Sequence, residues 1–437
     1  MAARGAPLLL CALLFASSFY FAHRFGSSLH PSLSLPAAAS SGGRGARLAA
    51  AAAPGAPAVY ACARWQARGI GEFSLLDVAS SLPALGAPPP LRHDAVDPAC
   101  PKFVQNDVNG MAGLGHRALN MLAALHAALH YNVTYAHTFS WGDGVHGAYW
   151  GWDALVGLDR FGLHWNQVAA RPGVREVRLP GPRGADPAAT RNHALYDAQW
   201  GPIVRAPGDC NVVYRLPGDV WPYDVTTATK PLLAHYFAAA AAERGGAAPM
   251  GAARALKWDP TAVNVVVHVR KGDVTSMPED VMARVVSETV LPALRRAGVG
   301  GRAAVHVFAE FRGYTAAAFP ALAALADEGG PRAVNVTFWE GASEWEAFLH
   351  MTAADFLVIS QSGFPKFASL LSLAPLTLSF PSSDHVKHAH ADTAPCYYDG
   401  RCSFSARTRV RAAAERLRSA EACGLLDRRG ARGGEQW

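Results

Sequence analysis

Val263-Asn-Val-Val-Val-His-Val-Arg-Lys-Gly-Asp273 is a run of β-branched residues that stops at a positively charged loop containing a glycine. Such a run predicts a strand buried on both faces, as in a parallel sheet. Ligands of open α/β sheets bind at the carboxyl ends of strands, where the planar guanidinium of Arg270 could grip a phosphate. The alternative is a surface loop whose charges solvate the strand end.

Downstream of this strand, the chain alternates apolar strands with helical patterns. Further strands are expected over residues 303–308, 333–338, 355–359 and 376–380. Helices are expected from a capping box at Ser276-Met-Pro-Glu279 to about Ala297, and over residues 314–326, 344–353 and 365–373. This alternation predicts a parallel, doubly wound sheet.

A second glycine-rich segment, Asn109–Arg117, precedes a helical pattern with leucines on one side and an expected strand over residues 133–136. Glycines permit close backbone approach, and a helix N-terminus attracts anions. The candidates for anion binding are Gly113, Gly115, His116 and Arg117. The alternative is a tight turn that packs the helix on the strand. Residues 141–200 are expected to be rich in loops, and their clustered tryptophans favour core or lid packing over sugar stacking.

A third loop, Ser360-Gln-Ser-Gly-Phe364, lies directly between an expected strand and an expected helix. The hydroxyls of Ser360 and Ser362 and the backbone amides near Gly363 and Phe364 could form a phosphate nest. Ordinary capping of the following helix is the alternative. His268 alternates with Arg270 along its strand, so both point to one face, although a lone strand histidine is usually a core residue.

The length of 437 residues allows two ordinary domains with additional segments. We expect an α/β chain of GT-B-like type, with two Rossmann-like domains over residues 100–250 and 251–425 facing across a cleft, and a tail over residues 426–437. An Ala-, Ser-, Gly- and Pro-rich stem is expected over residues 25–99.

The N-terminal segment indicates a targeting function. An apolar run from Pro7 to Ala22 follows Arg4, so residues 1–24 are predicted to be a signal anchor. A cleaved signal peptide is the second reading. An organellar transit peptide is the third, because no acidic residue precedes Glu72.

Two sequons, at Asn132 and Asn335, fit N-glycosylation of a lumenal domain. Outside the apolar run, the six cysteines lack the paired spacing of a zinc site. They could form disulfides, with Cys396 and Cys402 as the favoured local pair. A loop containing His385, His388, His390 and Asp392 could suggest metal ligands but would need further ligands in the correct geometry, and we expect no metal.

The net charge of +6 comes largely from the leader and the arginine-rich end, and there is no basic stripe interleaved with aromatic residues. We therefore expect no nucleic-acid partner. The serine loops also lack a nucleophile elbow, which disfavours a hydrolase.

The three loops, in this order, resemble those of the fucosyltransferase superfamily, including the α1,2-, α1,6- and protein O-fucosyltransferases and their plant and algal relatives. The similarity covers residues 105–380 and is most specific at His268–Asp273 and at Ala354–Ser362. It implies two Rossmann-like domains, GDP-fucose as donor and metal-independent inversion. Arg270 would bind the donor β-phosphate and Ser362 would hold the pyrophosphate. His116 stands where relatives often carry Asn or Gln, so its role stays open.

Glycosyl transfer requires stabilisation of an anionic leaving group, which arginine and oriented amides can supply. The candidates for a base on the acceptor hydroxyl are Asp273, Glu310 and Glu279, although Asp273 could instead orient Arg270 and Glu279 could only cap its helix. We expect a fucosyltransferase acting on a glycan or glycoprotein in the ER or Golgi lumen, with a secreted or organellar location as the alternative. A transferase for another nucleotide sugar, or a silent glycan-binding scaffold, are the rival functions.

Overall fold

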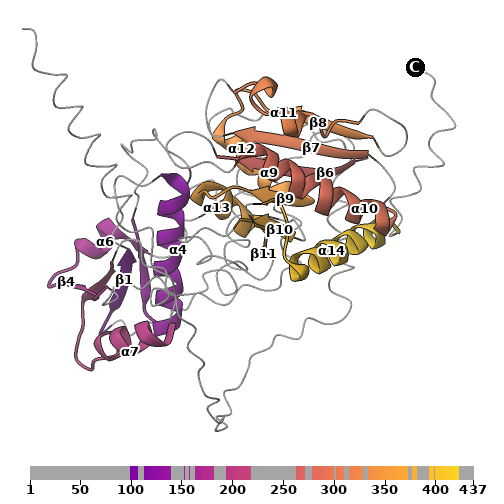
Figure 1. The fold of residues 1–437 in the computed structure, drawn as a ribbon. Helices are drawn as coiled ribbons and strands as arrows, with labels where there is room; N and C mark the ends of the chain where they lie inside the picture. Colours follow the sequence, from indigo (N-terminus) through magenta and orange to yellow (C-terminus); the bar gives the residue numbers. More distant parts are fainter. Residues whose placement is uncertain are drawn as a thin grey trace, which may run out of the picture. The chain divides into compact units, whose positions relative to one another are not determined.

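The computed structural model gives two parallel sheets, each with its own helices, and so an α/β fold (Figure 1). The residues that the structure describes are 99–106, 113–138, 152, 157, 163–181, 193–217, 262–270, 278–299, 302–309, 314–327, 333–372, 376–380, 393–397 and 399–422. The predicted leader, stem and tail lie outside these residues, and the expected domain boundaries stay predictions.

The C-terminal sheet has six parallel strands in the order β11-β10-β9-β6-β7-β8. In chain order this is the 3-2-1-4-5-6 arrangement of a doubly wound Rossmann sheet, as the alternation of strands and helices predicted. The strands are β6 (Ala262–Val269), β7 (Arg302–Ala309), β8 (Val334–Phe338), β9 (Phe356–Ile359), β10 (Leu376–Ser379) and β11 (Thr393–Pro395).

Helices cover both faces of this sheet, and its central strand β6 is therefore buried along its whole length. Val263, Val265 and Val267 share one core with α9, η6, α10, α11 and α14, whereas Val266 shares another with α12 and α13. The helical segments are α9 (Glu279–Arg284), η6 (Val285–Val290), α10 (Leu291–Ala297), η7 (Ala316–Ala318), α11 (Pro320–Ala323), α12 (Glu344–Ala353), α13 (Gly363–Leu371) and α14 (Phe404–Ala422).

The N-terminal sheet has five parallel strands in the order β3-β2-β1-β5-β4. Its elements are β1 (Lys102–Asn106), α4 (Leu114–Tyr131), β2 (Thr134–His137), β3 (Leu163–His164), α6 (Trp165–Ala169), β4 (Arg175–Arg178), α7 (His193–Val204) and β5 (Val212–Leu216). Residues 163–178 and 193–200, expected to be mainly loops, therefore contain strands and helices that the sequence patterns did not reveal.

Two local predictions for the C-terminal sheet were wrong. The helix over residues 314–326 is broken into η7 and α11, because Pro320 has no backbone N–H and starts a new helix. No capping box precedes α9, since Pro278 is its N-cap and Glu279 its first residue. The predicted end of this helix at about Ala297 is confirmed, and just before α10 it widens into the π-helical η6, where Pro292 removes an intrahelical donor.

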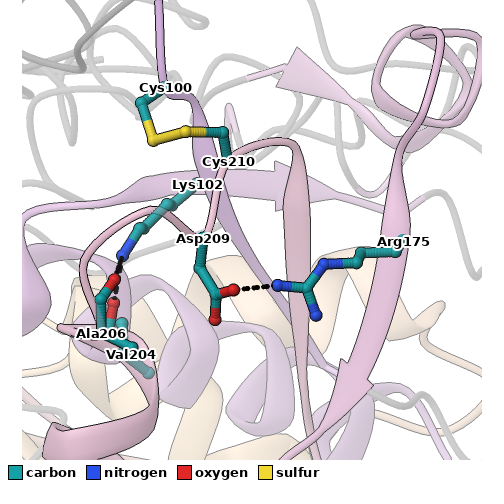
Figure 2. Close-up of a disulfide and its surroundings, with 7 residues drawn as sticks. All are labelled: Cys100, Lys102, Arg175, Val204, Ala206, Asp209 and Cys210. Atoms are coloured by element: carbon teal, nitrogen blue, oxygen red, sulfur yellow. Dashed lines mark hydrogen bonds and ion pairs between the residues drawn. A yellow bond between two sulfur atoms is a disulfide. The ribbon is translucent and has the colours of Figure 1, made fainter.

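A disulfide and a lysine tie the N-terminal sheet together (Figure 2). Cys100, before β1, is bonded to Cys210, before β5. Lys102 donates 2.8 Å hydrogen bonds to the carbonyls of Val204 and Ala206 at the end of α7, where a helix leaves carbonyls without intrahelical partners. A second disulfide joins Cys396 to Cys402, which confirms the predicted local pair.

Candidate active site

The candidate site lies at the point where the strand order of the C-terminal sheet reverses. From β6 the chain proceeds outward to β7 and β8, then returns to place β9 on the other side of β6. The loops after β6 and β9 therefore leave the same sheet edge in opposite directions. Ligands of doubly wound sheets bind at such a switch point. Arg270 begins one of these loops and Ser360 begins the other.

The two loops are joined through serine hydroxyls. Arg270 donates from Nη1 to Oγ of Ser362 at 2.7 Å, and from its backbone N–H to Oγ of Ser360 at 3.0 Å. Ser362 occupies the N-cap position of α13, but its side chain makes no capping bond. The alternative of ordinary helix capping is therefore wrong for Ser362, whose hydroxyl holds the guanidinium instead.

His268, on β6, contacts the first residue of the loop after β9. Its Nδ1 lies 3.0 Å from Oγ of Ser360, and its ring is 2 % exposed. Burial, and then the nearby charge of Arg270, lower the pKa of His268 to about 3. A neutral imidazole places no second positive charge beside Arg270, so His268 acts as a buried support and the guanidinium is the cation offered to a ligand.

The glycines of two loops bring two helix N-termini together. A Cβ on Gly115 would overlap the backbone of Gly363 and Phe364, and a Cβ on Gly363 would lie 2.8 Å from the backbone nitrogen of His116. The first turns of α4 and α13 thus touch backbone to backbone. Gly115 and Gly363 permit this close packing, and their part in anion binding stays a prediction.

The same contact concentrates positive potential near Arg270. Neither α4 nor α13 has a side-chain N-cap bond or an acidic residue in its first turn. Helix N-termini carry partial positive charge and unpaired N–H groups, which favour anions. Gly113 is the N-cap residue of α4, His116 is half-buried and Arg117 is buried. The structure therefore gathers all three predicted loops around one region suited to an anion.

A second buried polar network lies on the same face of the sheet, on β6, β7 and α12. Trp339 donates from Nε1 to Nδ1 of His306 at 3.1 Å, so the neutral ring of His306 carries its proton on Nε2 and donates to Oδ1 of Asn264, also at 3.1 Å. His350 donates from Nδ1 to the carbonyl of Glu346 at 2.6 Å. Burial lowers the pKa of His306 to about 3 and that of His350 to about 4. We call His268, His306 and His350 the C-sheet histidines.

One proposed base has another role. Both carboxylate oxygens of Glu279 accept backbone N–H groups of α11, from Ala321 and Leu322, at 2.9 Å each. This carboxylate caps a neighbouring helix, and we do not retain it as a base. Asp273 and Glu310 lie outside the described residues.

Aromatic side chains pack behind the loop after β9. Trp152 stacks on Trp345 with ring centroids 3.7 Å apart and meets Phe364 edge-on at 5.9 Å. Trp152 is 1 % exposed, so it belongs to the core, as the sequence favoured. Phe364, the second residue of α13, belongs to this cluster, an arrangement that no sequence signal indicated.

The described parts of the chain contain no group of three metal-ligating side chains, and the loop with His385 lies outside them. In those parts, no helix has both the length and the apolar composition needed to cross a bilayer. The sequon residues Asn132 and Asn335 are both exposed, at the end of α4 and on the edge strand β8.

Similarity to known proteins is found among solved structures. No protein-family model matches the chain, and no curated protein matches it. Similar solved structures include crystal structures of POFUT1, a protein O-fucosyltransferase, in complex with GDP and with GDP-fucose. Each is 12 % identical and covers 70 % of this chain and 99 % of its own, with TM-scores of 0.33 and 0.32. Because these scores are low, the fold and the site rest on the chain's own strands and contacts.

Proposed function

We propose that this protein is a glycosyltransferase that moves fucose from GDP-fucose to a hydroxyl of a glycan or glycoprotein, with inversion and without a metal. The observation that carries the proposal is the position of Arg270 at the switch point of a Rossmann sheet, held by Ser362. The resemblance of His268–Asp273 to the fucosyltransferase superfamily supports the choice of donor.

In the proposed reaction, the bond from the sugar C1 to the β-phosphate oxygen breaks as the acceptor oxygen bonds to C1 from the opposite side. The diphosphate leaves as an anion, which the guanidinium of Arg270 and the backbone amides at the start of α13 would stabilise. Ser362 fixes the direction of the guanidinium. The acceptor proton would pass to Asp273 or Glu310.

The lumenal location is part of the proposal. Two disulfides and two exposed sequons support a chain that matures in an oxidising secretory compartment. We propose an ER or Golgi membrane protein anchored by residues 1–24, with a secreted or organellar form as the alternative.

A donor panel tests the function directly. The full-length chain, produced in a eukaryotic secretory host, is assayed for GDP or UDP release from several nucleotide sugars, with and without EDTA. We expect selective, EDTA-resistant turnover or slow hydrolysis of GDP-fucose. Folded protein that neither binds nor turns over GDP-fucose would overturn the choice of donor.

Arg270→Ala separates an enzyme from a silent scaffold. Loss of a charged donor to the leaving group should lower kcat/KM by about 100-fold or more. Arg205→Ala, at an exposed ion pair with Asp197, is the matched control and should leave turnover unchanged. A scaffold would retain glycan binding in both variants and release no nucleotide in either.

A further inference from the structure

The C-terminal helix α14 carries exposed arginines that the proposed reaction does not use. Its buried side, with Ala406, Val410 and Leu417, packs in the core of the C-terminal sheet. Arg407 and Arg411 lie one turn apart on the solvent side, and Arg418 follows two turns later. At 1.5 Å per residue, this row extends over about 16 Å.

A neighbouring helix adds to the same charge. Helix α10 lies alongside α14, and a Cβ on Gly298 at the end of α10 would be 3.9 Å from the guanidinium carbon of Arg418 (Figure 1). Arg295 and Arg296, in the last turn of α10, are exposed. We call the five residues Arg295, Arg296, Arg407, Arg411 and Arg418 the basic face.

The charge of the basic face is largely uncompensated. Within the described parts of the chain, none of its five arginines forms an ion pair with a carboxylate. Among the side chains that the structure describes on these two helices, Glu415 of α14 and Glu288, just before α10, are exposed carboxylates near the basic face. Five cations outnumber these two anions, and the excess makes a local field that attracts negatively charged partners.

Two exposed aromatic side chains lie at the start of this row. Phe404 and Tyr397 are 78 % and 50 % exposed, and they are the exposed large hydrophobic residues of the described chain. Tyr397 lies in the short loop closed by the Cys396–Cys402 disulfide, where its backbone N–H donates to the carbonyl of Arg401 at 2.7 Å, and Phe404 is the first residue of α14. The backbone at both positions is therefore already ordered, so binding a partner would cost little additional conformational entropy there.

We propose that the basic face and this aromatic pair bind a linear glycan bearing sulfate or carboxylate groups. Guanidinium groups pair with both anions through two parallel N–H donors, and a row of them along one helix suits an extended polymer. Tyr397 and Phe404 offer flat apolar surfaces to sugar rings. This binding surface is separate from Arg270 and does not depend on the proposed transfer reaction.

A membrane surface fits these observations less well. An interfacial helix buries a continuous apolar side in the lipid, whereas the apolar side of α14 is already buried against the sheet. Only the aromatic pair at one end would be left to enter a bilayer. The arrangement of charge along the full helix thus favours a polymer over a lipid surface.

The test uses the full-length chain and immobilised probes of defined chemistry. Heparin supplies sulfate groups, polygalacturonate supplies carboxylates, and neutral dextran is the uncharged control. Arg407→Gln/Arg411→Gln/Arg418→Gln should weaken binding to the charged glycans by about tenfold or more, as expected for three lost ion pairs. The difference should disappear at high salt, since exposed pairs are screened.

A matched variant separates a site from net charge. Arg171→Gln/Arg175→Gln/Arg205→Gln removes three exposed arginines from β4 and from the ends of α6 and α7, and this variant should bind as wild type. Phe404→Ala should weaken glycan binding without changing its dependence on salt. Thermal melting of each variant checks that it is folded.

Three results would overturn the proposal. Equal losses in the two triple variants would mean that binding follows net charge alone. Unchanged binding in the α14 variant would exclude the basic face. Stronger binding to phosphatidylserine vesicles or to DNA than to either glycan, lost in the α14 variant, would assign the surface to a different class of partner. Tighter binding to heparin than to polygalacturonate would identify sulfate as the preferred anion, and the reverse would identify carboxylate. The nucleotide-sugar assay of the proposed function does not depend on any of these results.

Discussion

The backbone contact between α4 and α13 leads to a specific prediction for Gly363→Ala. A methyl group at this position would lie 2.8 Å from the nitrogen of His116 and 3.0 Å from the carbonyl carbon of Gly115. Both obstacles are backbone atoms, so no side-chain rotation relieves the overlap. The two helices must move apart by about half an ångström to restore normal contact distances.

The expected loss of stability follows from this displacement. Overpacking of a tight contact destabilises a protein by about 1–3 kcal/mol. The better helix propensity of alanine offsets at most about 1 kcal/mol of this loss. Ser362 precedes Gly363 directly, so the same shift should move the hydroxyl that holds Arg270 and weaken GDP binding.

Urea unfolding and GDP titration of the same preparations test both effects. Gly181→Ala is the matched control, because nothing lies within 4 Å of its added methyl group. It should change the free energy of unfolding by less than about 0.5 kcal/mol. Equal unfolding midpoints and equal GDP affinities for the two variants would refute the close approach of α4 and α13 at these glycines.

Three further predictions concern buried groups, disulfides and the serine loop. The C-sheet histidines have lowered pKa values in the folded state, so the stability that they permit is complete above pH 6.5 and is lost as the pH falls toward 4. At pH 5.5 each should reduce the free energy of unfolding by about 1 kcal/mol, and an unchanged urea midpoint between pH 7.5 and 5.5 would contradict this. Replacing Cys100 and Cys210 with serine removes a disulfide that joins residues 110 positions apart and should lower the free energy of unfolding by about 4.7 kcal/mol. Removing the Cys396–Cys402 disulfide, which spans six positions, should lower it by about 2 kcal/mol. Calorimetric melting of both variants shows which loss is larger. Ser362→Ala should raise the donor KM through loss of one charge-assisted hydrogen bond, with little change in melting temperature, and a normal KM would show that the guanidinium needs no such partner.

The C-terminal sheet could be predicted from the sequence because each of its signals is local. The valine run of β6 and the alternation of strands with helices depend on residues near each other in the chain. The N-terminal sheet offers weaker signals. Its strands β3 and β4 have two and four residues, and β4 is largely exposed, so neither has a strong hydrophobic pattern.

The candidate site likewise has features that the sequence predicted and features that it did not. Sequence alone identified Arg270 and Ser362 as residues at strand ends, since an apolar run that stops at a polar loop marks the carboxyl end of a parallel strand. Their hydrogen bond joins residues 92 positions apart and depends on β9 lying beside β6. That strand order depends on how the helices pack on the two faces of the sheet.

The roles of Gly115, Gly363 and Glu279 depended wholly on tertiary structure. A glycine-rich loop permits both anion binding and close helix packing, and the packing is visible only from the atoms opposite the missing Cβ. Glu279 likewise fits a local capping box by sequence, yet its carboxylate caps α11, 42 residues away. The sequence therefore indicated the candidate site residues and the elements on which they lie. Tertiary structure decided what each one touches, because contacts between distant segments are set by packing and leave no local pattern.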